Sequence, residues 1–278
     1  MIVLYIVGIA AAVLILAYSF MFHRELYHTD AVLEGNTHVA VDKLMVVAHP
    51  DDELIFGGRE LLEEQGWLVV CVTGGSNRSG NLLSFYPAVR RIREFKAVMD
   101  ALQCRYEMWD YEDYCFNANW GMVDLQIQLA ELLQRHTYKR IVTHNPDGEY
   151  GHIQHKRISD LIHNLRPANL FVFNYVSALN TGFDPLPPFN PYVPELSQLL
   201  SIYSSQHSII TKHHLNIIHQ GVRPVTFTDG LAITRAVTSV TPVIPDTTIA
   251  SDVGDTTVAT DVVPVAVCDS VGLVQTPI

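Results

Sequence analysis

Three polar residues follow a short apolar segment, and their types suit metal-assisted hydrolysis. The apolar run at residues 44–48 predicts a buried strand, and His49, Asp51 and Asp52 come directly after it. An imidazole and a carboxylate three residues apart lie on one face of a helix, so they can approach a single ion. A second acid beside them can accept a proton from water. This segment is therefore a candidate for part of a metal site and its general base.

Two further histidines, His152 and His155, supply what such a site still needs, and they too are three residues apart. Zn²⁺ in catalytic sites takes three protein ligands and leaves one position for water. Two of the three histidines with one of the two aspartates would form that set. The remaining histidine would stabilise an oxyanion, and the remaining aspartate would accept a proton. The residues alone do not decide which histidine binds the ion.

Each motif also has an ordinary structural interpretation. His-Pro-Asp-Asp at residues 49–52 is a plausible turn and helix N-cap, and the later pair could be two solvent-facing histidines on a helix. The catalytic interpretation is favoured because both motifs follow predicted parallel strands, and ligands of such sheets bind beyond the carboxyl ends of the strands.

The remaining polar residues have weaker patterns. We expect Arg91 and Glu94 to pair on a helix face. Four other histidines show no partner pattern and are expected at the surface or in a polar part of the core: His207, His213, His214 and His219.

The elements that position the two motifs alternate between strand and helix. Strands are predicted at residues 44–48, 67–73, 105–109, 140–143 and 169–176, and helices at 52–65, 87–103, 123–136, 153–165 and 195–207. This alternation predicts an α/β fold: a three-layer, Rossmann-like, mostly parallel sheet with helices on both faces.

The two ends of the chain differ from this body. Residues 2–22 carry no charged side chain and are long enough to cross a bilayer, so we predict one N-terminal transmembrane helix over residues 1–22. A cleaved signal peptide is the alternative. Residues 23–43 are predicted to be a juxtamembrane spacer, 44–236 the catalytic domain, and 237–278 a low-complexity tail rich in Thr, Val and Asp.

Charge bears on location and partners. Arg24 and Lys43 follow the apolar span, and nothing basic precedes it except the amino terminus, so the positive-inside rule places the body in the cytosol. The formal net charge is -11 and no Lys/Arg-rich run is present, which argues against a nucleic acid partner.

The motifs resemble those of a known family, the zinc-dependent sugar N-deacetylases related to N-acetylglucosaminyl-phosphatidylinositol de-N-acetylase (PIG-L or LmbE-like). The match to its first motif is Ala48-His49-Pro50-Asp51-Asp52-Glu53, and to its second Gly151-His152-Ile153-Gln154-His155. The resemblance covers about residues 44–206. It departs from one branch of the family at residues 149–151, which look like the bacterial enzymes for soluble glucosaminides, whereas the predicted anchor looks like the eukaryotic lipid-linked enzyme.

The resemblance implies a role for each matching residue. His49, Asp52 and His155 would bind Zn²⁺ or another divalent transition metal. Asp51 would be the general base, and His152 would stabilise or protonate the tetrahedral intermediate. The remaining matched residue, Tyr150, would line the substrate pocket.

The expected function is therefore metal-dependent removal of acetate from an N-acetylglucosamine conjugate, most simply N-acetylglucosaminyl-phosphatidylinositol in the biosynthesis of GPI anchors. In a eukaryote the body would lie on the cytosolic side of the endoplasmic reticulum. One alternative is a deacetylase for a soluble N-acetylglucosaminide or another N-acetyl sugar. Another is a membrane-tethered binding protein without turnover. The complete set of acids and histidines argues against this second alternative.

Overall fold

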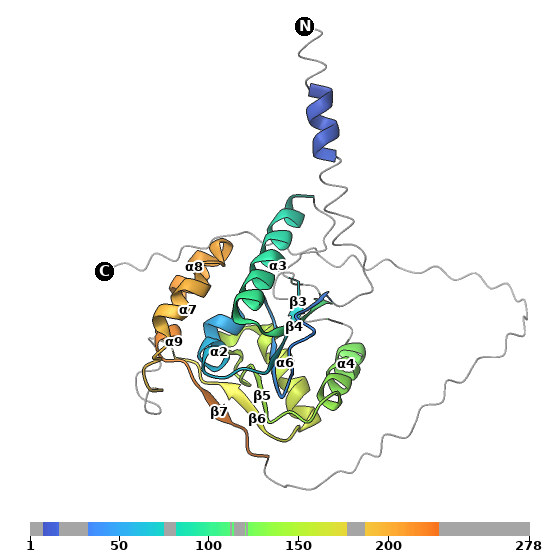
Figure 1. Cartoon of the computed structure of the whole chain (residues 1–278). Coiled ribbons are helices and arrows are strands. Elements are labelled where there is room, and N and C mark those ends of the chain that lie inside the picture. Colours follow the sequence, from blue (N-terminus) through green and yellow to red (C-terminus); the bar gives the residue numbers. More distant parts are fainter. Residues whose placement is uncertain are drawn as a thin grey trace, which may run out of the picture. The chain divides into compact units, whose positions relative to one another are not determined.

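Figure 1 shows the computed structural model of the chain, which describes residues 8–16, 33–74, 82–111, 113, 120, 122–176 and 187–227. By its contacts the chain divides into two units, Met1–Phe227 and Thr228–Ile278. The second unit, and with it the predicted tail, lies outside the described residues. The unit that can be described holds both motifs.

The described residues form a seven-stranded sheet in the order β1-β4-β3-β2-β5-β6-β7. The inner strands run parallel, and the two edge strands pair antiparallel to their neighbours. The bounds are β1 Leu33–Gly35, β2 Lys43–Val47, β3 Trp67–Thr73, β4 Arg105–Tyr111, β5 Arg140–Thr143, β6 Leu170–Phe173 and β7 Val222–Pro224.

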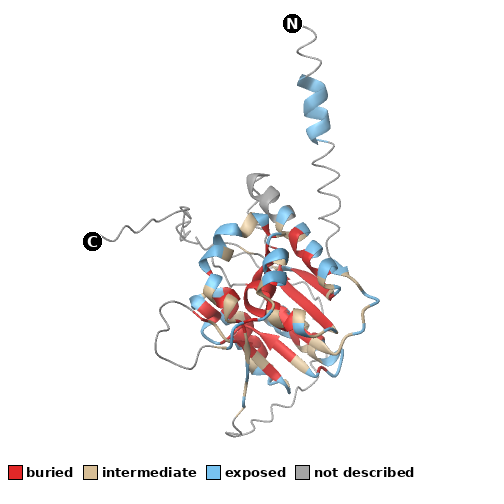
Figure 2. Ribbon diagram, turned by 60° about the vertical axis from the view of Figure 1, so that its left-hand side comes forward, coloured by how far each residue is buried: buried red, intermediate tan, exposed pale blue. Residues whose placement is uncertain are grey.

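The central strands are buried because helices cover both faces of the sheet. Successive side chains of a strand point to opposite faces, so Met45 and Val47 of β2 join one apolar cluster while Leu44 and Val46 join the other. Figure 2 shows the result as buried strands at the centre, with exposed residues on the helices and loops around them. A continuous apolar strand of this kind is what a sheet covered on both faces requires.

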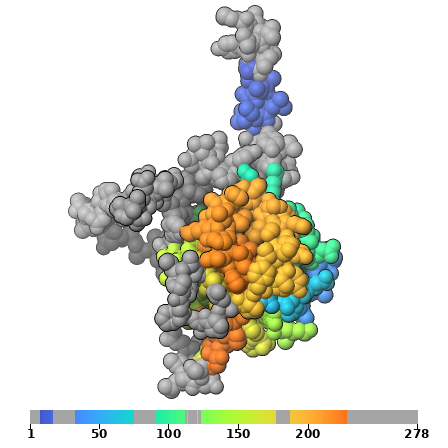
Figure 3. All heavy atoms as spheres, turned by 90° about the vertical axis from the view of Figure 1, so that its left-hand side faces the viewer, coloured from blue at the N-terminus to red at the C-terminus, as the bar shows by residue number. Residues whose placement is uncertain are grey.

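The helices fall into two layers. The bounds are α2 Asp52–Glu63, α3 Leu82–Leu102, α4 Met122–Gln134, α5 Gly148–Gly151, α6 Ile153–Leu165, α7 Val193–Leu200, α8 His207–Lys212 and α9 His214–Ile218, with a 3-10 turn, η1, at Ser204–Gln206. Residues of α2, α3 and α7 contribute to one cluster, and residues of α4 and α6 to the other. In Figure 3 the orange-coloured segment that includes α7 to α9 covers one side of the body.

The predicted architecture is confirmed, a mixed α/β fold with helices on both faces of the sheet. Strands β3 and β5 and helix α6 have the predicted bounds. The differences lie at the margins. Residues 33–35, inside the stretch expected to be a spacer, form β1 and pair with β4. The helix predicted at 195–207 ends at Leu200 and is followed by η1, because the chain turns at residues 201–203.

The predicted membrane anchor is described only in part. Residues 8–16 are helical with exposed side chains, and residues 1–7 and 17–22 lie outside the described residues. Within the described ranges, no helix combines the length and the apolar character needed to span a bilayer.

Candidate metal centre and active site

The two sequence motifs meet at one point of the sheet. The first loop, residues 48–53, follows β2, and the second loop, residues 144–155, follows β5. β2 and β5 are neighbouring parallel strands. On the β2 side the sheet continues with β3 and β4, and on the β5 side it continues with β6 and β7. In parallel α/β sheets such a reversal of strand order opens a crevice at the carboxyl ends of the strands, where ligands bind. The topology therefore brings the predicted site residues together.

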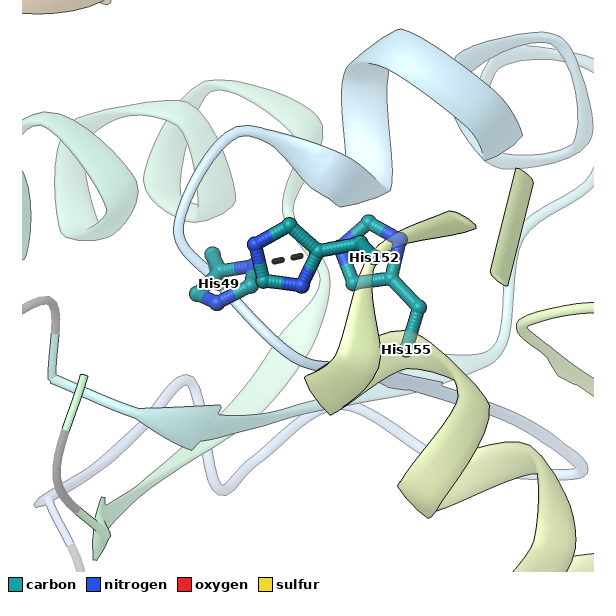
Figure 4. A group of neighbouring side chains, drawn as sticks. All are labelled: His49, His152 and His155. Atoms are coloured by element: carbon teal, nitrogen blue, oxygen red, sulfur yellow. Dashed lines mark hydrogen bonds between the residues drawn. The ribbon is translucent and has the colours of Figure 1, made fainter. Parts of the chain in front are cut away.

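Three side-chain atoms form a compact group in this crevice. His49 Nδ1 lies 3.1 Å from Asp52 Oδ2 and 3.2 Å from His155 Nε2. The third side of the triangle, from His155 Nε2 to Asp52 Oδ2, is 3.3 Å. All three residues are buried. Figure 4 shows the rings of His49 and His155 with their contact dashed, and the ring of His152 beside them.

The triangle has the dimensions of a divalent metal site. Ligands bound to Zn²⁺ at about 2.0–2.1 Å in tetrahedral geometry lie about 3.3 Å from one another. Two imidazole nitrogens and one carboxylate oxygen are also a ligand set that zinc uses in hydrolases. The donor atoms thus fit such an ion, although the assignment of His49, Asp52 and His155 as its ligands stays a prediction.

Hydrogen bonds at the far side of each ring orient these donors. His49 Nε2 lies 2.5 Å from Gln154 Oε1, so that nitrogen carries the proton and Nδ1 presents its lone pair. His155 Nδ1 lies 2.6 Å from Glu149 Oε2, so His155 presents Nε2. Partners of this kind fix the tautomers of metal-binding histidines.

The charges at the centre favour a cation. Burial alone would lower the pKa of His155, but the carboxylates of Asp52 and Glu149 outweigh it and raise the pKa to about 10. Burial would likewise raise the pKa of Asp52, and the two histidines hold it well below its usual value instead. Asp52 is therefore a carboxylate in the folded protein, as a metal ligand must be.

Asp51 occupies a strained backbone conformation beside this centre. Its φ is 116°, in the region that favours glycine. Its N–H donates to Glu53 Oε2 at 3.0 Å, and its carbonyl accepts from the N–H of Ile55 at 2.9 Å. Tyr203 in turn donates its hydroxyl to Glu53 Oε1 at 2.6 Å. Strain persists only where the surroundings impose it, and it is concentrated at functional sites.

The acidity of Asp51 suits proton transfer near neutral pH. Burial raises its pKa, Arg91 opposes that effect, and the neighbouring Asp52 adds to it, so that the pKa is about 7. A general base works best when its pKa lies near the working pH. The role of Asp51 as base stays a prediction that this environment supports.

Arg91 does not form the helix-face pair expected for it. It is Arg90 that bonds Glu94, at 3.2 Å. Arg91 instead turns into the site, where its guanidinium donates to the Pro50 carbonyl at 2.9 Å and to Asp113 at 3.0 Å, and lies 3.6 Å from Asp51. The i,i+4 spacing of residue 90 with Glu94 suits a helix as well as i,i+3 does, so the sequence could not choose between the two arginines.

His152 and Tyr150 lie at the outer side of the centre. His152 caps α6, and its Nδ1 accepts the N–H of Gln154 at 3.3 Å, so Nε2 carries the proton. Burial and the charges of His49 and His155 lower the pKa of His152 to about 3, which keeps the ring neutral. Tyr150 is 40% exposed, and its ring centroid lies 5.6 Å from that of His155. Its expected role in lining a substrate pocket stays a prediction.

Three further residues near the site also had no predicted role there. His144 and Glu149 are buried in the second loop, and His213, expected to be a surface or polar-core residue, is buried with its ring centroid 4.8 Å from that of Tyr150. A signal existed for His144, because it follows β5 directly, as His49 closely follows β2. For Glu149 and His213 the sequence pattern gave none.

A cation stands at the rim of the site. Lys212, at the end of α8, has its Nζ 5.1 Å from the ring centroid of Tyr150. Within the described part of the chain no carboxylate forms an ion pair with it, and the adjacent His213 is neutral, because burial lowers its pKa to about 4. The rim therefore presents a positive charge that an anionic group of a ligand could meet.

Comparisons with known proteins agree with the motifs. The model of the family "PIG-L: GlcNAc-PI de-N-acetylase" matches residues 44–166. An uncharacterized protein of Acanthamoeba polyphaga mimivirus is 45% identical over 205 residues, which cover 72% of this chain and 87% of that protein. Among solved structures, the N,N'-diacetylchitobiose deacetylase of Pyrococcus horikoshii aligns with a TM-score of 0.50 and 16% identity, over 66% of this chain and 84% of that one.

These findings differ in what they establish. The structural likeness at 16% identity shows a shared fold and not a shared reaction. The family match spans β2 to α6, and therefore includes both loops of the site. Taken with the motifs at residues 48–53 and 151–155, it shows that this chain belongs to the PIG-L family, the family of the GlcNAc-PI de-N-acetylases.

Proposed function

We propose that this protein is a metal-dependent N-deacetylase that hydrolyses the acetamide of an N-acetylglucosamine conjugate. The observation that carries the proposal is the triangle of His49 Nδ1, Asp52 Oδ2 and His155 Nε2, with sides of 3.1 to 3.3 Å, next to the strained Asp51. A protein that only bound a ligand would gain nothing from an acid held in that conformation.

His49, Asp52 and His155 would hold the metal, with zinc as the expected ion. A bound divalent cation there would act as a Lewis acid toward the carbonyl and would make water a stronger nucleophile. The other roles belong to the side chains of this chain and follow from their positions.

Asp51 accepts the proton when the oxygen of water bonds to the acetamide carbon. The carbonyl π bond breaks in the same step and leaves a tetrahedral centre with a negative oxygen. His152, a neutral ring with its proton on Nε2, donates a hydrogen bond to that oxygen. The C–N bond then breaks, the amine nitrogen takes the proton held by Asp51, and acetate and the free amine leave.

The direct test is acetate release by the purified full-length chain from a panel of N-acetylglucosaminides, together with a metal analysis. The proposal predicts about one divalent ion per chain, loss of acetate release in a chelator, and recovery when Zn²⁺ is returned. A fully metal-free chain that still released acetate would exclude the mechanism, and a metal-loaded chain that cleaved none of the panel would exclude the substrate class.

For the substrate, we propose an N-acetylglucosamine linked to an anionic group, as in N-acetylglucosaminyl-phosphatidylinositol. The rim cation Lys212 supports this choice, because its Nζ is 5.1 Å from the ring of Tyr150 and has no carboxylate partner among the described residues. A phosphodiester attached to the sugar would find a complementary charge there. A neutral, soluble glucosaminide would not use it.

The substitution Lys212→Gln separates these substrates. It should lower kcat/KM for N-acetylglucosaminyl-phosphatidylinositol by about 5- to 10-fold, the effect of losing an ion pair of about 1 kcal/mol. It should leave methyl N-acetylglucosaminide unaffected. The matched control is Lys139→Gln, since Lys139 pairs with Asp42 just before the first residue of β5, away from the site. Equal losses for both substrates would exclude a specific role for the cation.

The predicted anchor and its orientation complete the proposal. An apolar segment at residues 2–22 would hold the site near the headgroup of a lipid-linked substrate, with the body in the cytosol. Protease treatment of sealed membrane vesicles should digest the body from the cytosolic side. Protection of the body until detergent is added would exclude this orientation.

A further inference from the structure

Glu149 joins two buried histidines of the second loop. Its Oε2 lies 2.9 Å from His144 Nδ1 and 2.6 Å from His155 Nδ1. Its Oε1 accepts the backbone N–H of Asn145 at 2.9 Å. The two histidine rings are stacked, with centroids 3.9 Å apart. One carboxylate therefore holds both rings.

The proton positions in this group can be assigned by counting donors and acceptors. His144 Nε2 accepts the backbone N–H of Ala48 at 2.9 Å, so its proton is on Nδ1 and is donated to Glu149. A carboxylate only accepts, so His155 must donate from Nδ1 as well. His155 Nε2 therefore points at Asp52 and His49, and it offers its lone pair there once its own proton has left to make room for a cation.

This assignment also separates two alternative donor sets. Asp52, His144 and His155 lie close enough to form a metal group, as do the histidines at 49, 152 and 155. His144 Nε2, however, is already engaged by the Ala48 N–H and lies 3.6 Å from Asp52. His144 thus serves to link the first loop to Glu149, and His155 is left as the donor from the second loop.

The backbone is strained to place this carboxylate. Glu149 has φ 58° and ψ −83°, and Asn145 Oδ1 accepts its N–H at 3.1 Å. The Asn145 amide also donates to the Phe173 carbonyl of β6 at 3.2 Å. Strain of this kind persists where the position of a side chain is needed.

We propose that Glu149 is a positioning residue for metal binding: its carboxylate locks His155 in the tautomer that offers Nε2 to the ion, and His144 couples that lock to the first loop. The inference rests on the proposed metal-dependent function. Carboxylates behind metal-binding histidines typically strengthen metal affinity by about 10- to 100-fold.

The test is the Zn²⁺ affinity of the full-length Glu149→Gln variant, measured by competition with a chelating dye. If the amide oxygen of glutamine replaces Oε2 and accepts from both rings, the NH₂ group opposes the Asn145 N–H; in the flipped orientation it opposes the N–H groups of both rings. Either way the negative charge behind His155 is lost. We expect affinity to fall by about 10- to 100-fold.

The matched control is Glu107→Gln. Glu107 lies on β4 and is also buried. Its carboxylate pairs with Arg135 at 2.6 Å and not with a histidine. Its variant should keep wild-type metal affinity. An equal loss in both variants would overturn the proposal, since a general effect of removing a buried charge would then suffice.

A second variant, Glu149→Asp, keeps the charge and guards against misfolding. It should bind Zn²⁺ more tightly than Glu149→Gln, and equal affinities would refute the role of the carboxylate. Wild-type affinity in Glu149→Gln would refute it too. None of these readouts involves turnover. If the chain bound Zn²⁺ but cleaved no acetamide, the proposed function would be wrong while the role of Glu149 in metal binding could still hold. If Glu149→Gln kept wild-type affinity, the role of Glu149 would be wrong while acetate release would be unaffected.

Discussion

The two loops of the site hold acids in opposite states. In the first loop, burial is the main influence and raises the pKa of Asp51 to about 7 and that of Glu53 to about 8. In the second loop, burial would also raise the pKa of Glu149, but His144 and His155 outweigh it and lower the pKa to about 2. The neighbours, and not the residue type or the depth of burial, decide the charge.

The difference between these pKa values suits the acids of the two loops to different roles. An acid with a pKa near neutrality can take up and release a proton, as a general base must. An acid with a very low pKa is a fixed charge that orients whatever donates to it. In the proposed mechanism the first loop would carry the reacting group, Asp51, and the second loop would carry the supporting group, Glu149. Each of the following substitutions tests one side of that contrast.

Asp51→Asn should remove the reacting group alone. We expect acetate release to fall by about 10²- to 10⁴-fold, the usual contribution of a general base, with the metal content near one ion per chain. Acetate assays and elemental analysis of one preparation would check both expectations. If the variant turned over normally, the proton would have to go elsewhere.

His155→Ala should break the connection between the loops, because His155 contacts both Asp52 and Glu149. The loss of a direct ligand should exceed the loss of a residue behind it, so we expect Zn²⁺ affinity to fall by more than about 100-fold. Retention of one tightly bound ion would remove His155 from the ligand set. His163→Ala is a suitable control, since His163 lies on α6 and bonds the Ser159 carbonyl at 2.7 Å.

Glu53→Gln tests the raised pKa in the first loop. The folded protein holds the Glu53 proton up to about pH 8, and the unfolded chain releases it near 4.5. Between these values the folded state binds more protons, so this group makes stability fall as pH rises. Urea unfolding of the metal-free protein at pH 5 and pH 8 should show a fall that is smaller in the variant by more than about 1.4 kcal/mol. Parallel pH profiles would show that Glu53 is ionised throughout.

Tyr203→Phe should have the smallest effect. It removes the hydroxyl that donates to Glu53 at 2.6 Å from the segment after α7. We expect a loss of about 1 kcal/mol in the free energy of unfolding, as for one hydrogen bond, and an unchanged metal content. Tyr192→Phe, at a partly exposed position before α7, would serve as the comparison. A loss of metal in Tyr203→Phe would mean that this segment also shapes the ligand set.

The sequence predicts the parts of this molecule that depend on long patterns. The apolar runs of β2 and β3 and the amphipathic helix α6 extend over enough residues for their period to be recognised. The edge strands β1 and β7 have only three residues each, and α8 and α9 are interrupted at His213. Such short elements carry no period, and tertiary pairing determines them.

The site was predictable to a similar degree. The candidate residues His49, Asp51, Asp52, His152 and His155 have characteristic types and spacings, so the sequence could name them, and the structure brings them together while their roles stay predictions. Residues that only position other side chains, such as Glu53 and Arg91, can be of several types. Their partners are also distant in sequence. Glu53 and Tyr203 are 150 positions apart, and Arg91 and Pro50 are 41 apart. Their pairing becomes visible only in the folded chain.

The pairing of β2 with β5 has a consequence for biosynthesis. His49 and His155 are 106 positions apart, and the strands that carry them become neighbours only after the intervening β3, β4 and α4 have left the ribosome. A nascent chain that ends before α6 would therefore hold two of the three proposed ligands, His49 and Asp52, and lack the third. If the proposed metal site forms, it would be completed only after residue 155 has emerged from the ribosome, so metal would be loaded late in synthesis.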